Sequence, residues 1–139
     1  MRSDKRTDIV KKNKIYIDNL TSIDVWESPT FTADIYVGLK PGYEGRIPGF
    51  AMERARKICQ EYCDLVGFAV TFEATEFIYT GGNEQGIKVG LINYPRYPSE
   101  KAQILRHALI LADRLKHVLD QYRVSIVTSD TTYMLGEME

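Results

Sequence analysis

The sequence predicts an α+β domain with the ferredoxin-like, split βαβ arrangement, in which two helices cover one face of an antiparallel sheet. Two segments repeat apolar residues every three or four positions, as amphipathic helices do. Four other segments alternate apolar and polar residues, as half-buried strands do, and the resulting order is strand, helix, strand, strand, helix, strand. A chain of 139 residues is long enough to bury one such core.

The first strand and the first helix have the clearest patterns. Residues 30–40 alternate strictly, and the apolar members are Phe31, Ala33, Ile35, Val37 and Leu39. Residues 50–66 carry an apolar stripe made of Met52, Ala55, Cys59, Tyr62, Cys63 and Val66. Gly67 follows directly, and we expect it to end the helix with a positive φ.

The second and third strands form a predicted hairpin. Apolar residues alternate from Phe68 to Ala74, after which the phase slips, so we expect a β-bulge near Thr75. Residues 81–83 (Gly-Gly-Asn) predict the turn, and residues 87–91 return as the third strand.

The second helix is predicted over residues 99–122, with Ser99 as its N-cap. Residues 123–128 follow as the fourth strand, and we expect residues 131–135 either to extend it or to pair with another strand. The helix has a main stripe of Leu105, Ala108, Leu109, Ala112, Leu115 and Leu119, and a thinner stripe of Ile104, Leu111 and Val118.

The N-terminus differs from the rest of the chain in charge. Residues 1–14 sum to +4, so the net charge of −1 leaves −5 for the remainder. We expect residues 1–13 to form a flexible basic tail, or an arm that grips a phosphate or a neighbouring subunit, and residues 14–139 to form a single domain. Residues 14–20 are predicted as a short edge strand or an exchanged arm, and residues 21–29 as a loop.

Composition narrows the location and the chemistry. No apolar run follows the N-terminal charges as in a signal peptide, and none is long enough to span a membrane. Cys59 and Cys63 lie four apart on one helix face, where a disulfide is hard to close, so we expect reduced thiols and a cytoplasmic protein. Because no metal-ligand spacing or catalytic motif is present, we predict no metal, no cofactor and no catalytic residues.

Residues 15–20 (IYIDNL) resemble the first-strand signature of RNA-recognition motif domains, and residues 35–39 (IYVGL) resemble it again. That resemblance implies the same order of strands and helices and a sheet that binds RNA. The third predicted strand, however, lacks the alternating aromatic residues on which bases stack. With a net charge near zero as well, we do not expect a nucleic-acid polymer as a partner.

The predicted sheet has a face opposite the helices that is too apolar for ordinary surface and too polar for core. In the register of the alternating strands it holds Tyr36, Thr71, Glu73, Ile92, Tyr94 and Val127. Exposed apolar faces of this kind usually contact another molecule. We therefore expect either another subunit of a homo-oligomer or a bound ligand to lie against this face.

A ligand site is predicted around residues 93–98 (NYPRYP), just before the second helix. Aromatic rings stack on nucleobases, and an arginine near a helix N-terminus pairs with a phosphate. The predicted ligand-binding residues are Tyr94 and Tyr97 for stacking, Arg96 and Arg46 for phosphate, Asn83 and Asn93 for hydrogen bonds, and Tyr36 and Tyr43 beside them.

The sequence alone favours a non-catalytic homo-oligomer that binds a small anionic, nucleotide-like ligand near a subunit interface. A phage or mobile-element protein that sequesters a host nucleotide signal fits that description. Two alternatives stay open. One is a small cofactor-free enzyme with a pocket between paired sheets, whose acid or base is Glu73, His107 or a tyrosine. The other is a protein-interaction module.

Overall fold

The computed structural model describes residues 10–41 and 46–137, so Tyr43 lies outside the described residues. In chain order the strands and helices are β1 (Lys11–Tyr16), β2 (Ser22–Glu27), β3 (Thr32–Gly38), α2 (Ala51–Val66), β4 (Thr71–Tyr79), β5 (Gly82–Ile92), α3 (Lys101–Val118), β6 (Arg123–Thr128) and β7 (Thr132–Gly136). Neither described helix is long and apolar enough to cross a membrane.

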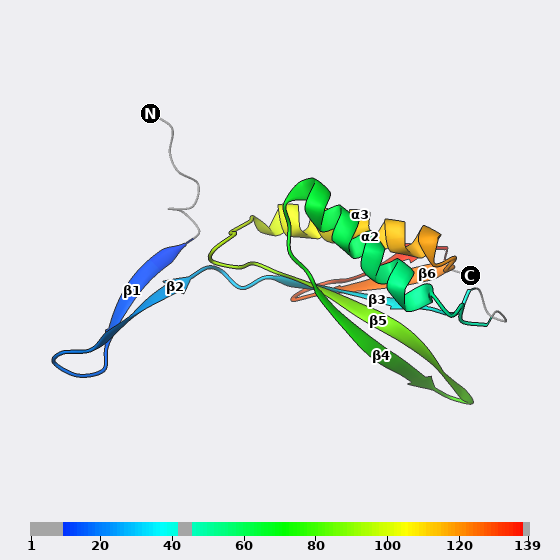
Figure 1. Ribbon diagram of the computed structural model, residues 1–139, viewed down its shortest axis with the longest axis horizontal. Coiled ribbons are helices and arrows are strands. Elements are labelled where there is room, and N and C mark those ends of the chain that lie inside the picture. The colour runs from blue at the N-terminus through cyan, green and yellow to red at the C-terminus, as the bar shows by residue number, and fades with distance from the viewer. Residues whose placement is uncertain (1–9, 42–45, 138–139) are drawn as a thin grey trace.

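Strands β3 to β7 form one antiparallel sheet in the order β4-β5-β3-β6-β7, and both helices lie on the same face of it (Figure 1). Strands β3, β4, β5 and β6 stand in the order of a split βαβ domain, so the predicted ferredoxin-like α+β fold is confirmed. Residues 132–136 do not extend β6. They fold back as β7, which pairs antiparallel with β6 and adds a fifth strand at the edge of the sheet.

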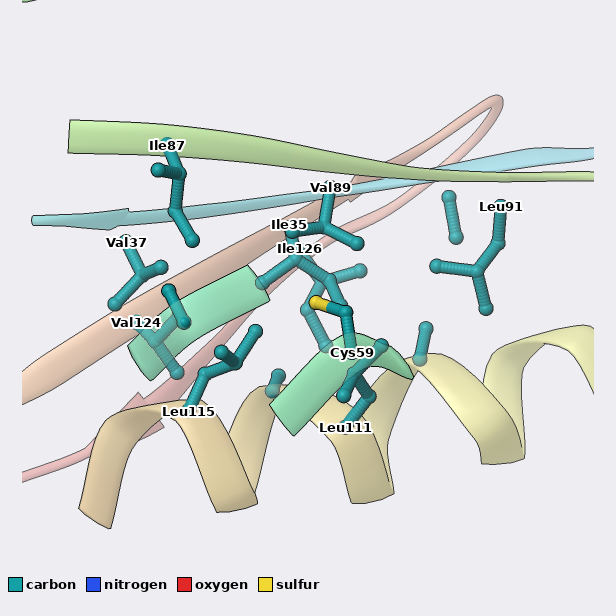
Figure 2. Packing of buried hydrophobic residues seen from close by; sticks show 14 of the residues in the cluster. Ile35, Val37, Cys59, Ile87, Val89, Leu91, Leu111, Leu115, Val124 and Ile126 are labelled. Carbon is teal, nitrogen blue, oxygen red and sulfur yellow. The ribbon is translucent and has the colours of Figure 1, made fainter. Parts of the chain in front are cut away.

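The helix-covered face of the sheet holds the hydrophobic core (Figure 2). Ile35, Val89 and Ile126 come from three neighbouring strands, and none of them has exposed surface. Leu111 and Leu115 of α3 meet these side chains from the helix layer. Burying one large aliphatic side chain stabilises a fold by roughly 1.5–3 kcal/mol, so this layer is the main source of stability. Helix α2 adds Ala51, Ala55, Cys59 and Tyr62.

The two apolar stripes predicted for helix α3 are buried to different extents from those expected. Ile104 and Leu111, predicted for the thinner stripe, are fully buried, whereas Leu105 and Leu109 from the main stripe are only half-buried. The reason is that α3 contacts both the sheet and α2. Its apolar arc is therefore wide, and the periodicity alone does not tell which part faces the sheet.

Strand β4 runs without the predicted bulge near Thr75. Its pairing with β5 continues from residue 71 to residue 79 with no extra residue on either strand. The apolar positions change phase because Phe77 faces the other side of the sheet. There its ring packs edge-on against Tyr36, with 6.4 Å between the ring centroids.

Strands β1 and β2 form a separate hairpin, the arm (residues 11–27), which extends away from the sheet and the helices (Figure 1). The prediction of a loop over residues 21–29 is therefore wrong for β2, and β1 begins at Lys11, earlier than the strand predicted from residue 14. Asp18 closes the turn, because its carboxylate accepts hydrogen bonds from the backbone N–H groups of Leu20 (2.8 Å) and Thr21 (2.7 Å). Of the two segments that resemble an RNA-recognition signature, residues 15–20 thus lie in the arm, whereas residues 35–39 lie at the end of β3 in the five-stranded sheet.

Candidate functional site

The face of the five-stranded sheet away from the helices, called the open face below, is lined by alternate residues of its strands. The register places Tyr36 between Lys88 of β5 and Ser125 of β6, and places Glu73 of β4 beyond Lys88. The register agrees with the face predicted for Tyr36, Thr71, Glu73, Ile92 and Val127.

Charged and aromatic side chains gather on the half of the open face formed by β3, β4 and β5. Asp34 and Lys88 form an ion pair with 3.9 Å between carboxylate oxygen and Nζ. The same Nζ lies 5.9 Å from the centre of the Tyr36 ring. Glu73 is directly across the strand pair from Lys88, and Phe77 packs against Tyr36. These five residues form the acidic–aromatic cluster.

Glycines on the open face leave room for this cluster. A Cβ added at Gly90 would lie 3.2 Å from the carboxylate of Asp34. A Cβ at Gly86 would contact the ring of Phe77 and would lie 2.6 Å from the carbonyl oxygen of Val37. The neighbouring side chains therefore lie flat on the sheet at these two positions, which a larger residue would prevent.

A groove of about 650 Å³ opens at the end of the sheet where β5 leads into α3. That volume is within the range of small-molecule sites. Ile92 lines the groove and also belongs to the open face, so the two surfaces are continuous. The groove brings together three of the predicted ligand residues. Its lining includes Phe68, Ile92, Tyr94, Arg96, Tyr97 and Ser99.

The loop between β5 and α3 is folded back on itself at the groove. Tyr94 and Tyr97 form a bridge in which the N–H of Tyr97 donates to the carbonyl oxygen of Tyr94 at 3.0 Å. The Arg96 guanidinium lies 5.4 Å from the centre of the Tyr97 ring, and both side chains are exposed. An exposed ring beside a guanidinium suits a ligand that combines a nucleobase with a carboxylate.

Asn93 is predicted as a ligand residue, but its polar groups are engaged within the protein. Its Nδ2 donates to the carbonyl oxygen of Pro29 at 2.8 Å, and its Oδ1 accepts from the N–H of Ser99 at 2.9 Å. Its backbone N–H donates to Phe31 at 3.1 Å, and its carbonyl oxygen accepts from the hydroxyl of Ser28 at 3.0 Å. Asn93 is buried and ties the base of the arm to the groove loop.

A tyrosine–histidine pair stands behind the groove. The ring of Phe68 packs on His107 with 4.8 Å between centroids, and His107 Nδ1 lies 2.5 Å from the hydroxyl of Tyr62. Burial lowers the pKa of His107, and the nearby charge of Arg106 lowers it further. Burial raises the pKa of Tyr62. Both groups are therefore neutral near pH 7, and His107 supports the groove wall from behind.

Asn83 and Arg46 lie at the opposite end of the sheet. Asn83 is near the start of β5 and Asn93 follows its end, a separation of roughly 33 Å along an extended strand. Arg46 follows β3, which runs antiparallel to β5, so it is also at the far end. The predicted residues thus do not form one site. Tyr36 lies on the open face between the two ends, and Tyr43 is outside the described residues.

The acidic–aromatic cluster contains residues that the ligand-site prediction lacks. Asp34 and Lys88 follow the same two-residue alternation as Tyr36, so including charged residues in that alternation would have found them. Phe77 had no such signal, because the expected bulge places it on the covered face.

The two cysteines are free thiols. Burial raises the pKa of Cys59 to about 12 and also raises the pKa of Cys63. Neither side chain is therefore a thiolate nucleophile near neutral pH. In the part of the chain that the structure describes, no three His, Cys, Asp or Glu side chains are grouped as metal ligands.

These features define a class: ferredoxin-like α+β domains with a charged and aromatic open face that ends in a groove. Two solved structures share the fold. One is a phage SAM lyase in complex with S-methyl-5'-thioadenosine, with a TM-score of 0.64 and 19% identity, covering 78% of this chain and 90% of that chain. The other is a phage SAM lyase in the apo state, with a TM-score of 0.63 and 21% identity, covering 77% and 89%. No protein-family model and no curated protein matches the sequence.

At these identities the likeness shows the fold. It also contradicts the prediction of a non-catalytic protein that sequesters a ligand, because the proteins that share the fold are lyases. The alternative of a small enzyme agrees better with this finding.

Proposed function

We propose that this chain is a small lyase that cleaves S-adenosylmethionine, or a closely related sulfonium nucleoside, without a cofactor. The observation that carries the proposal is the acidic–aromatic cluster beside a groove, on a fold shared with phage SAM lyases. The substrate has two positively charged groups, its sulfonium and its α-ammonium. Carboxylates and aromatic faces are the side chains that attract such cations.

The proposed reaction breaks the bond between the sulfur and the γ-carbon of the methionine part. The electron pair goes to sulfur, which becomes neutral, and S-methyl-5'-thioadenosine is released. The carboxylate of the same substrate attacks the γ-carbon and forms a five-membered lactone, so the atoms balance without water or a co-reactant. Because opposite charges disappear in this step, a site that excludes water favours it.

The residues have separate roles in this proposal. Glu73 accepts the α-ammonium, which keeps its charge throughout the reaction, and the face of Tyr36 lies against the sulfonium. Tyr94 and Tyr97 stack the adenine in the groove. Since this substrate carries no phosphate, Arg96 has no phosphate to bind and instead borders the groove.

The open face needs a second wall before it excludes water. We therefore include in the proposal a homo-oligomer, in which a neighbouring chain covers part of this face and the pocket lies between subunits. The shared fold with phage enzymes supports a phage origin, and the proposal keeps the cytoplasmic location expected from the sequence.

The decisive experiment is to incubate the purified chain with S-adenosylmethionine and to measure S-methyl-5'-thioadenosine by chromatography. We expect product from the wild type and a roughly 10- to 100-fold lower kcat/KM for Glu73→Gln. A hydrogen bond to a charged group contributes about 1.5–3 kcal/mol, which corresponds to that loss. Tyr97→Ala should raise KM more than it lowers kcat.

The matched control is Glu76→Gln, on the same strand but three residues further and on the other face. It removes the same charge and should leave kcat/KM unchanged. An inactive wild type that also fails to bind the substrate at millimolar concentration would rule the proposal out. Equal losses in Glu73→Gln and Glu76→Gln would rule out the assigned role of Glu73.

A further inference from the structure

Lys88 stands in the middle of the acidic–aromatic cluster and is the cation among its five residues. The register places Glu73 of β4 directly opposite Lys88 on one side and Tyr36 of β3 directly opposite on the other. Neighbouring strands are about 4.8 Å apart, so these three residues form a row across the sheet, roughly 10 Å from end to end. The carboxylates of Asp34 and Glu73 thus face one ammonium group between them.

The ammonium group of Lys88 is held in place and still has donors for a ligand. Its Nζ lies 3.9 Å from the carboxylate of Asp34, which is an ion pair longer than a hydrogen bond. A lysine has three N–H donors, and the side chain of Lys88 is 32% exposed. A negatively charged group on the open face can therefore approach Nζ while the ion pair with Asp34 stays in place.

The charges of S-adenosylmethionine match those of the cluster. The substrate has an α-ammonium, a sulfonium and a carboxylate, which leave one net positive charge, whereas Asp34, Glu73 and Lys88 leave one net negative charge. The roles proposed above place the ammonium at Glu73 and the sulfonium at Tyr36, at the two ends of the row. Because the ammonium and the carboxylate are bonded to the same carbon, the carboxylate then lies next to Lys88.

We propose that Lys88 binds the carboxylate of the substrate and makes the site specific for nucleosides whose amino-acid end keeps that group. The inference rests on the proposed function, since it assigns a role at the same site. It places the carboxylate between the ammonium at Glu73 and the sulfonium at Tyr36, and so beside the γ-carbon that the carboxylate attacks. Lys88 orients this group and takes no part in the bond that breaks.

Arg96 is a second cation near the candidate site, but it lies at the adenine end. It lines the groove beside Tyr97, whereas Lys88 lies on β5 four residues before Ile92 at the edge of the groove. Four residues of a strand span roughly 13 Å. When the adenine is stacked in the groove, the amino-acid end of the substrate therefore extends toward Lys88 and away from Arg96.

The test measures the binding of two unreactive ligands by calorimetry. One is S-adenosylhomocysteine, which lacks the sulfonium, and the other is the same compound without its carboxylate. We expect the wild type to bind the first about tenfold or more tightly, as a hydrogen bond between charged groups gives. Lys88→Met and Lys88→Gln should both lose this preference, and Lys88→Arg should retain most of it.

Three further variants separate carboxylate binding from a structural role. Asp34→Asn removes the partner of Lys88 but leaves its charge, so it should keep the preference; a purely structural ion pair predicts the same result for Asp34→Asn and Lys88→Met. Arg96→Met should also keep the preference. Lys57→Met removes an exposed lysine of α2, and as the matched control it should bind both ligands like the wild type. Circular dichroism checks that each variant is folded.

Kinetics with S-adenosylmethionine give a second readout. The carboxylate loses its charge as the lactone forms, so its ion pair with Lys88 is strongest in the bound substrate. Lys88→Met should therefore raise KM about tenfold and change kcat less. A variant that merely distorts the sheet would lower kcat as well.

The outcomes distinguish this inference from the proposed function. If the wild type cleaves S-adenosylmethionine but Lys88→Met keeps the preference for the carboxylate, the inference is wrong and the proposed function stands. Loss of the preference in Arg96→Met, or in Asp34→Asn to the same extent as in Lys88→Met, would also overturn the inference. A wild type that binds neither ligand and releases no S-methyl-5'-thioadenosine would overturn both. Loss of the preference in Lys88→Met, with Asp34→Asn and Arg96→Met unaffected, supports the inference.

Discussion

The two faces of the five-stranded sheet are built from the same strands but have opposite properties. In β3, Ala33, Ile35 and Val37 are buried beneath the helices. Between them, Asp34 and Tyr36 belong to the acidic–aromatic cluster on the open face. Because successive side chains of a strand point to opposite faces, one short segment supplies both the core and the candidate site. Substitutions at adjacent positions of β3 should therefore affect either the stability of the fold or the candidate site, but not both.

The largest expected effect comes from comparing an Ile→Ala substitution on the covered face with the same substitution on the open face. Ile35→Ala removes a fully buried side chain and should lower the free energy of unfolding by about 2–5 kcal/mol. Ile92→Ala removes a side chain that is 36% exposed and should cost less than about 1 kcal/mol when the chain is monomeric. Urea unfolding at low protein concentration measures both. Equal losses would contradict the division between the faces.

Asn93 is a buried polar residue at the end of the sheet, and its removal should have the next largest effect. Asn93→Ala leaves the Pro29 carbonyl and the Ser99 N–H without their partner, at about 1–3 kcal/mol for each buried group left unpaired. Ser28→Ala removes one bond from the same group and should cost about 1 kcal/mol. A value for Asn93→Ala no larger than that for Ser28→Ala would show that Asn93 is not a structural tie.

Gly86 is the position where the open face should behave like the core. Gly86→Ala places a methyl group against the Phe77 ring and 2.6 Å from the Val37 carbonyl oxygen, so it should destabilise by about 1–3 kcal/mol. Gly49→Ala is the control, because nothing lies within 4 Å of its added Cβ. Thermal unfolding compares the two. A neutral Gly86→Ala would mean that the open face has more room than its geometry indicates.

The smallest expected effect is a pH dependence on the helix side. Burial holds the pKa of His107 below its ordinary value of 6.5, so the unfolded chain takes up a proton first as the pH falls. The free energy of unfolding should therefore decrease below about pH 6.5, down through the lower folded pKa. His107→Gln should weaken the pH dependence of stability, measured as the melting temperature between pH 5 and 8. His117→Gln changes an exposed residue of α3 and should leave that pH dependence unchanged.

Periodicity predicted much of the fold because it depends only on which side of an element is buried. Residues 123–128 form β6 as predicted, and α2 begins one residue from its predicted start and ends with Gly67 at φ 70°. The arm was predicted only in part, because its turn depends on the Asp18 side chain and its face meets no core. The bulge was wrong because Phe77 was assumed to be a core residue.

The candidate site was harder to predict than the fold. Tyr94, Arg96 and Tyr97 were predicted together because two tyrosines and an arginine precede a helix, and they line one groove. Asn93 was taken as a ligand residue. Its side-chain amide instead bonds the carbonyl oxygen of Pro29 and the N–H of Ser99, so it holds two loops together. A sequence does not distinguish an asparagine that ties loops together from one that binds a ligand, since both follow a strand.

By itself, the sequence determined which residues of a strand or helix share a face, because that follows from the backbone period of strands and helices. The tertiary structure decided which of these residues meet. Antiparallel pairing carries Asn83 and Asn93 to opposite ends of β5, and it brings Asp34, Glu73 and Lys88 from three strands onto one face. Only the pairing of strands fixes those distances, and no local pattern encodes them.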